Sequence, residues 1–174
     1  MRRHVLLFAF GFLVANSAFA QVGTSGIPLT EVFGGVSYFR AGVTQGSNLA
    51  GWQAAVDYNL SKHVGVVLDF GGQYKSVDGT TLSLYQYMFG PRFKHRSGRA
   101  TIFMHGLVGG DATHVPGYTQ GAFAAGFGGG LDVNVSALVA IRVCQIDWIH
   151  DHTRDAWTHN VRGAVGVVFK FPKP

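Results

Sequence analysis

Two charged residues lie symmetrically about an expected turn and could form an ion pair. Asp132 and Arg142 are each five positions from Ala137. In a hairpin centred on Ala137 the two side chains would oppose each other on one face. Buried charges must be paired, so the spacing favours a structural ion pair, with a gated ion path as the alternative. Asp147 has the opposite parity to Arg142, so both can share a face only if a bulge intervenes.

A second candidate for chemistry is the tripeptide His95-Arg96-Ser97. A histidine beside a serine can act as the base that activates a serine nucleophile. No convincing glutamate partner is nearby, and the tripeptide falls in an expected short turn. The sequence therefore predicts no catalytic residue here.

Several histidines near the C-terminal third could in principle bind a metal. A metal site needs ligands that converge on one point, and loop residues at unrelated positions do not predict such convergence. We interpret them as solvated loop residues and predict neither a metal nor a cofactor, while His105 is expected to form hydrogen bonds in the interior. The loop residues in question are His114, His150, Asp151, His152 and His159.

The N-terminal residues carry an export signal. Arg2 and Arg3 are followed by the apolar run Val5–Val14 and by Ala18-Phe19-Ala20. A basic start, an apolar stretch and a small-residue cleavage site define a secretory signal peptide. We therefore expect residues 1–20 to be removed and residues 21–29 to form a periplasmic N-terminal segment.

The composition narrows the class of protein. Charged residues make up 13% of the 174-residue chain and apolar residues 47%, whereas a soluble domain has about 25% charged residues. No apolar run in the mature chain is long enough for a transmembrane helix. The net charge of +5 comes without a basic block or an RNA-binding motif, so no nucleic-acid partner is expected. The single Cys144 excludes an intramolecular disulfide.

Alternating hydropathy predicts β-strands throughout the mature chain. Between Trp52 and Leu60, apolar and smaller or polar residues alternate over nine positions, which is long enough for a strand that crosses a membrane. Seven further stretches follow the pattern, the first less cleanly, and Pro91 is expected near a strand end, where a lost ladder hydrogen bond costs least. The eight expected strands are 30–41, 52–60, 64–71, 85–93, 100–110, 123–134, 138–149 and 161–171.

The connections between these stretches alternate in length. Short ones are expected at Ser61, His95 and Ser136, and longer ones near Val43, Ser76, Thr113 and His152. Short periplasmic turns and longer extracellular loops are typical of outer-membrane barrels. An even number of strands then leaves both chain ends in the periplasm.

Barrel size indicates which face is the interior. Eight inward rows of Trp, Tyr, Phe and Val would overfill so narrow a barrel, whereas small and polar side chains fit. We therefore expect the large apolar side chains to face lipid, with aromatic girdles that include Trp52, Tyr58, Phe93, Trp148 and Phe171. In the 100–110 strand, Ile102, Met104 and Val108 should face outward. The predicted interior polar network consists of Asp57, Asp69, Gln86, Arg92, Asp132, Arg142 and Arg162.

Four segments carry a resemblance to a known family. They are Phe33-Gly34-Gly35-Val36-Ser37-Tyr38, Phe89-Gly90-Pro91-Arg92-Phe93, Phe127-Gly128-Gly129-Gly130-Leu131-Asp132 and Ile141–Trp148. On these residues the chain resembles the small OmpA-like outer-membrane β-barrels over residues 21–171. The resemblance implies an all-β, eight-stranded antiparallel up-and-down transmembrane barrel over 30–171, with a tail at 172–174. It also implies recognition of the aromatic end, Phe169-x-Phe171, by the barrel-insertion machinery.

These observations lead to a functional expectation. We expect a non-enzymatic protein of the cell outer membrane with a structural or surface-interaction role, a lumen plugged by side chains, and contacts to lipids including lipopolysaccharide. The first alternative is a narrow porin-like channel for ions or small solutes. The second is an enzyme that modifies lipid A, because lipid A deacylase barrels use a His-x-Ser arrangement; here that motif falls on the expected periplasmic side, away from the outer leaflet.

Overall fold

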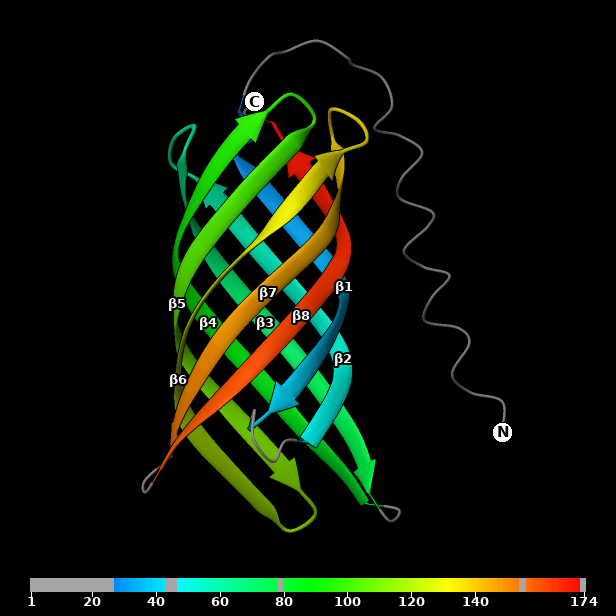
Figure 1. Cartoon of the computed structure of the whole chain (residues 1–174), viewed down its shortest axis with the longest axis vertical. Coiled ribbons are helices and arrows are strands. Elements are labelled where there is room, and N and C mark those ends of the chain that lie inside the picture. The colour runs from blue at the N-terminus through cyan, green and yellow to red at the C-terminus, as the bar shows by residue number, and fades with distance from the viewer. Residues whose placement is uncertain (1–26, 43–46, 78–79, 154–155, 173–174) are drawn as a thin grey trace, which may run out of the picture.

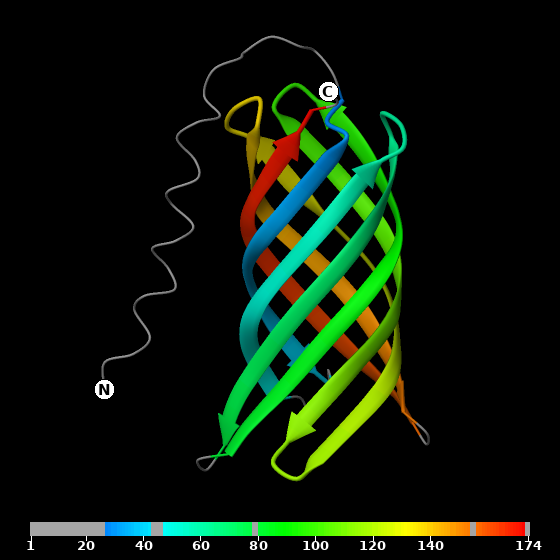
Figure 2. The same cartoon turned by 180° about the vertical axis from the view of Figure 1, so that it is seen from behind.

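The chain forms one closed antiparallel β-barrel (Figures 1 and 2). The computed structural model describes residues 27–42, 47–77, 80–153 and 156–172. The expected signal peptide lies outside these residues. The strands are β1 (Thr30–Ala41), β2 (Ser47–Asn59), β3 (Val64–Val77), β4 (Thr80–Ser97), β5 (Ala100–Val115), β6 (Tyr118–Asn134), β7 (Val139–Thr153) and β8 (Ala156–Phe171).

Each strand pairs with its neighbours in sequence, and β1 closes the barrel against β8. The closing ladder runs from Thr30 opposite Phe171 to Arg40 opposite Val161. The predicted eight-stranded up-and-down barrel is thus confirmed. Closure leaves no unpaired sheet edge. An open edge in lipid would leave backbone N–H and C=O groups without hydrogen-bond partners. No helix among the described residues is long and apolar enough to span a membrane.

The two ends of the barrel are distinct. β1 begins and β8 ends at the same end (Figure 1), which we call the terminal end. The opposite end, which carries the β1–β2, β3–β4, β5–β6 and β7–β8 connections, is the distal end.

The prediction of longer connections at the distal end is wrong in three of four places. Ser76, Thr113 and His152 all lie within strands, and only two residues separate β3 from β4, β5 from β6 and β7 from β8. The polar residues there lack apolar alternation, but backbone pairing continues through them because ladder hydrogen bonds do not depend on side-chain type. Gly117, with φ 83°, supplies the left-handed residue of the β5–β6 turn. The predicted connection near Val43 involves residues 43–46, which lie outside the described residues.

Connections are present at Ser61 and Ser136 as predicted, but each spans four residues, so the predicted alternation of short terminal-end and longer distal connections is wrong. The third, predicted from His95, begins later, because β4 continues to Ser97 and turns at Gly98, whose φ is 56°. Pro91 is also placed differently from the prediction. It lies well inside β4, facing outward and opposite Val66. The β4–β5 ladder is interrupted at Gly90 and Pro91, so the missing proline N–H falls where that pairing is already lost.

The facing of the side chains follows the prediction. Every strand exposes large apolar side chains on the outer surface, including Ile102, Met104 and Val108 of β5 and the five predicted girdle aromatics, although some large apolar side chains also face the lumen. The lumen holds the buried residues, both apolar and polar. Its larger apolar members are Phe33, Phe39, Leu49, Leu84, Met88, Phe103, Leu107 and Ile149.

Candidate functional site

A network of buried charged side chains fills the lumen. Three arginines, Arg92, Arg142 and Arg162, are at most 2% exposed. Each comes from an inward position of a different strand and lies within 3.1 Å of at least one carboxylate. All seven polar residues predicted for the interior are buried and face the lumen.

Asp132 and Arg142 are direct cross-strand partners, as the turn spacing predicts. Asp132 lies opposite Arg142 in the β6–β7 ladder. The guanidinium donates from Nε and Nη2 to the two oxygens of Asp132, at 2.8 and 3.0 Å. It also stacks on the rings of Phe33 and Phe103, at 4.2 and 4.3 Å from the centroids. This bidentate, aromatic-flanked geometry is a strong form of ion pair.

A bulge in β7 brings Asp147 to the same face as Arg142. The ladder with β8 shifts between Arg142 and Gln145, and Val143 and Cys144 both face outward. The extra residue reverses the inward–outward alternation of β7 after Arg142. This is the bulge that the sequence predicted would be needed for Arg142 and Asp147 both to face inward. Gln145 then bridges them: it accepts from Arg142 Nη1 at 2.6 Å and donates to Asp147 at 2.8 Å.

Arg162 of β8 joins two carboxylates from distant strands. It pairs with Asp147 at 2.7 Å and with Asp69 of β3 at 2.8 Å. Gln53 donates to Asp69 at 2.6 Å, and Gln86 accepts from Arg162 Nη1 at 3.5 Å. This part of the network therefore crosses the barrel rather than following one hairpin.

His105 links this cluster to the next. One imidazole nitrogen lies 2.9 Å from Asp147 Oδ1, and the other lies 3.0 Å from Arg92 Nη2. Arg92 pairs in turn with Asp57 at 3.1 Å. The expectation that His105 forms hydrogen bonds in the interior agrees with these contacts.

At the terminal end the network continues through Glu31, Lys94 and Arg96, which the sequence did not predict as members of the interior network. Lys94 pairs with Glu31 at 2.6 Å and with Asp57 at 2.7 Å, and Arg96 pairs with Glu31 at 3.0 Å. Lys94 shares the inward parity of Arg92 on β4, so parity alone could have placed it. Its pairing with Glu31 could not be found this way, because the two residues are 63 positions apart.

The charges of this network balance. The ion pairs connect five carboxylates to five basic side chains, which together we call the lumen network: Glu31, Asp57, Asp69, Asp132, Asp147, Arg92, Lys94, Arg96, Arg142 and Arg162. Removing one partner of a buried pair costs about 3–5 kcal/mol, since the other charge is left uncompensated. The lumen network therefore opposes any conformational change that separates one of its ion pairs.

Near the distal end, two more buried carboxylates lie outside these ion pairs. Asp111 of β5 and Asp151 of β7 are 5% and 8% exposed. Asn160 donates a short hydrogen bond to Asp151 Oδ2, and Gly42 N donates to Asn160 Oδ1 at 2.8 Å. Within the described ranges, no Lys, Arg or His lies within ion-pair distance of either carboxylate.

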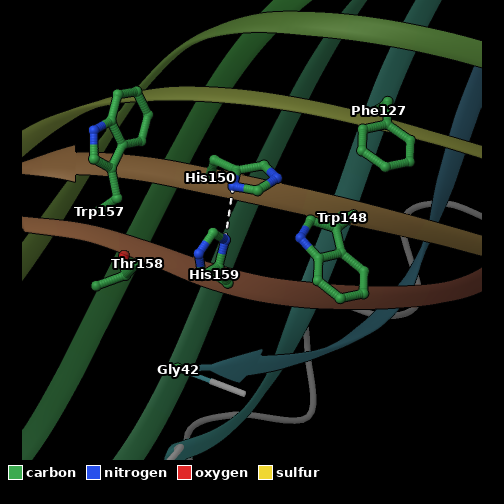
Figure 3. Close-up of a pocket in the computed structure, with 7 residues that line it drawn as sticks. All are labelled: Gly42, Phe127, Trp148, His150, Trp157, Thr158 and His159. Carbon is green, nitrogen blue, oxygen red and sulfur yellow. Dashed lines mark hydrogen bonds between the residues drawn. The ribbon is translucent and has the colours of Figure 1, made fainter. Parts of the chain in front are cut away.

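A separate pocket lies on the outer surface over β6, β7 and β8 (Figure 3). Its volume is about 600 Å³, and it is lined by Phe127, Trp148, His150, Trp157 and His159 among others. The Nδ1 atoms of His150 and His159 are 2.8 Å apart. We call this the aromatic–histidine pocket.

The histidines expected in solvated loops lie in strands instead. His152 packs against Trp157, with ring centroids 4.5 Å apart, and His114 packs edge-on against Tyr85 at 5.8 Å. Asp151 faces the lumen, away from His150. Among the described residues, no three His, Cys, Asp or Glu side chains are arranged to hold a metal ion.

His95 and Ser97 lie at the terminal end of β4 and are both exposed. The imidazole stacks on His63, with ring centroids 6.5 Å apart. Within the part of the chain that the structure describes, no carboxylate lies within ion-pair distance of His95. The geometry provides no third group to orient the histidine as a base.

Several solved structures share the architecture of this chain. Neisserial surface protein A aligns with a TM-score of 0.71 at 12% identity, over 82% of this chain and 97% of the other. Ail, the attachment invasion locus protein of Yersinia pestis, aligns at 0.56 and 15% identity, over 80% and 97%. The N-terminal β-barrel domain of OprF from Pseudomonas aeruginosa aligns at 0.53 and 12% identity, over 82% and 98%.

No protein-family model and no curated protein matches the chain. The comparisons therefore support the fold, a closed eight-stranded antiparallel β-barrel, which this chain shares with these structures. At these identities the likeness concerns the fold.

Proposed function

We propose that this protein is a non-enzymatic outer-membrane barrel with a plugged lumen and a structural or surface-interaction role. The observation that carries the proposal is the charge-balanced lumen network, which links strands on opposite sides of the barrel through Arg92, His105, Asp147 and Arg162. The interior of an eight-stranded barrel is narrow enough for its own side chains to fill. An ion would have to break buried pairs to pass.

Planar-bilayer conductance tests the plugged lumen. The wild-type protein should give no steady openings. Replacing a charge pair by small side chains, as in Asp132→Ser with Arg142→Ser, should open a narrow water path without leaving an unpaired charge. The outward-facing double variant Ile146→Ala with Val165→Ala is the matched control and should stay closed. Steady, ion-selective openings of the wild type would instead support the porin-like alternative.

The proposed location is the outer membrane, with the terminal end in the periplasm. Support comes from the outward apolar surface and from the export signal expected at residues 1–20. The start of β1 and the end of β8 also lie together at the terminal end. In a Cys144→Ser background, Thr119→Cys at the distal end should react with a membrane-impermeant maleimide on intact cells. Arg99→Cys at the terminal end should react only after lysis. The reverse pattern would contradict the orientation.

Outer-membrane lipids, including lipopolysaccharide, are the proposed partners of the outer surface. Trp148 and Trp157 are 42% and 57% exposed beside the imidazoles of His150 and His159. Amphipathic aromatic rings prefer the level of lipid headgroups. The double variant Trp148→Ala with Trp157→Ala should co-purify with less lipopolysaccharide than wild type. Equal amounts would remove this pocket from the proposal.

The absence of enzymatic activity is proposed from the exposed, unassisted His95 and Ser97. If the tripeptide were catalytic, overexpression would change the lipid A profile and Ser97→Ala would reverse that change. We expect identical lipid A mass spectra for cells with empty vector, wild type and Ser97→Ala.

A further inference from the structure

The distal lumen contains a cavity that leads from the surface to two buried carboxylates. Its volume is about 390 Å³. Gln120 and Thr158 on its wall are exposed, whereas Asp111 and Asp151 are more than nine-tenths buried. Cavities of about 300–1,000 Å³ are typical of small-molecule sites. We call this the distal cavity and the two carboxylates the acidic pair.

Every other buried carboxylate of the described lumen pairs with a basic side chain, whereas neither member of the acidic pair does. Asp57 and Asp69 also each have one oxygen without a hydrogen bond, but both pair with a basic side chain. Asp151 Oδ1 has no hydrogen-bond partner, and Asp151 Oδ2 accepts a hydrogen bond from the neutral Asn160 amide. Two like charges that share a buried site favour a cation between them.

The shape and lining of the distal cavity select among cations. A metal ion such as Ca²⁺ takes about six to eight oxygen ligands and fills little volume, and the described residues hold no cluster of three metal-ligating side chains. The wall of the distal cavity also includes the apolar Phe39 and Leu84. The buried carboxylates can bind a cationic group, and the apolar wall beside them can contact a hydrocarbon chain attached to that group.

We propose that the distal cavity binds a small primary alkylammonium, with its charged head between Asp111 and Asp151 and its hydrocarbon chain against Phe39 and Leu84. An ammonium has three donors and no acceptor, so it can donate to both carboxylates and to one neutral oxygen of the wall. The same chemistry could come from a free diamine or from a lysine side chain of another protein. This inference goes beyond the plugged-barrel function and does not depend on conductance.

The test is calorimetric titration of the folded protein in detergent micelles at pH 8, with 1,5-diaminopentane as the probe. Wild type should bind one diamine per barrel in a saturable manner. Asp111→Asn and Asp151→Asn should each weaken binding at least tenfold. Asp132→Asn makes the same chemical change near the terminal end of the lumen, outside the distal cavity. It is the matched control, and the folded protein should bind as wild type.

A second variant keeps both charges and removes the space. Ala122 lines the distal cavity, so Ala122→Leu should abolish diamine binding while heat-modified gel mobility shows a folded barrel. Titration with Nα-acetyl-lysine methylamide ranks the two sources, since the tighter ligand identifies whether a free diamine or a lysine side chain fits better.

Three results would overturn the proposal. The first is no saturable binding by wild type, which would mean that the acidic pair is structural and shares a proton. The second is equal binding by all carboxylate variants, which would indicate non-specific adsorption. The third is one-to-one binding of Ca²⁺ or Mg²⁺ that is tighter than binding of the diamine, because the site would then be a metal site.

Discussion

Buried carboxylates lie both in the middle and at the distal end of the lumen, but their charges are surrounded differently in the two regions. In the lumen network every carboxylate has a basic partner. Arg162 pairs with both Asp69 and Asp147, and Lys94 pairs with both Glu31 and Asp57. Around the acidic pair the described residues provide a cavity and a neutral amide instead. The middle of the lumen is therefore charge-balanced by its own side chains, whereas the distal end leaves two carboxylates beside a cavity.

The largest expected effect comes from removing Arg162. Arg162→Leu leaves Asp69 and Asp147 buried without their shared cation, which should lower the free energy of unfolding by about 3–5 kcal/mol. Urea unfolding, followed by heat-modified gel mobility, measures the change. Arg40→Leu removes the same side chain from the exposed face of β1 and should change stability by less than about 0.5 kcal/mol. Similar losses in both variants would contradict the special status of the lumen network.

A double-mutant cycle at Asp132 and Arg142 tests the same idea on one pair. Arg142→Met should cost about 3 kcal/mol, because Asp132 keeps a buried charge without its bidentate partner. Adding Asp132→Leu removes that charge and should recover part of the loss, with a coupling energy of about 1–3 kcal/mol. Additive losses in the double variant would mean that the two residues do not act as a pair.

Space, as well as charge, limits the paired region. A Cβ at Gly128 would clash with the Asp147 carboxylate and lie 2.6 Å from the Ile146 carbonyl oxygen. Gly128→Ala should therefore destabilise the barrel by about 1–3 kcal/mol. Gly106→Ala is the matched control, since a Cβ there meets nothing within 4 Å. Equal unfolding midpoints would show that the lumen accommodates the methyl group.

The acidic pair should respond with the opposite sign. Without a bound cation at pH 8, Asp151→Asn relieves like-charge repulsion with Asp111 and should raise the free energy of unfolding by about 1 kcal/mol. Asp147→Asn makes the same chemical change within the lumen network and should lower it, because Arg162 loses a partner. Urea unfolding of the two variants side by side measures the signs. A loss of stability in both would remove the distinction between the two regions.

Much of this architecture could be predicted from residue order alone. The period-two alternation in β2 and β3 indicated strands and which side chains face the lumen, because backbone geometry turns successive side chains to opposite faces. The spacing about Ala137 predicted the pairing of Asp132 with Arg142, since a tight hairpin relates nearby positions by simple counting. The strand extensions at Ser76, Thr113 and His152 were missed, because polar residues on both faces leave no alternation to detect.

Only the tertiary structure decided how the lumen side chains combine. It placed the bulge at Val143 and Cys144, which turns Arg142 and Asp147 to one face, and it joined Glu31 to Lys94 across the barrel. It also brought Asp111 and Asp151 together in one cavity without a basic partner among the described residues. The physical reason is closure: local alternation determines the direction of each side chain, whereas the register and curvature of the closed barrel determine which side chains meet.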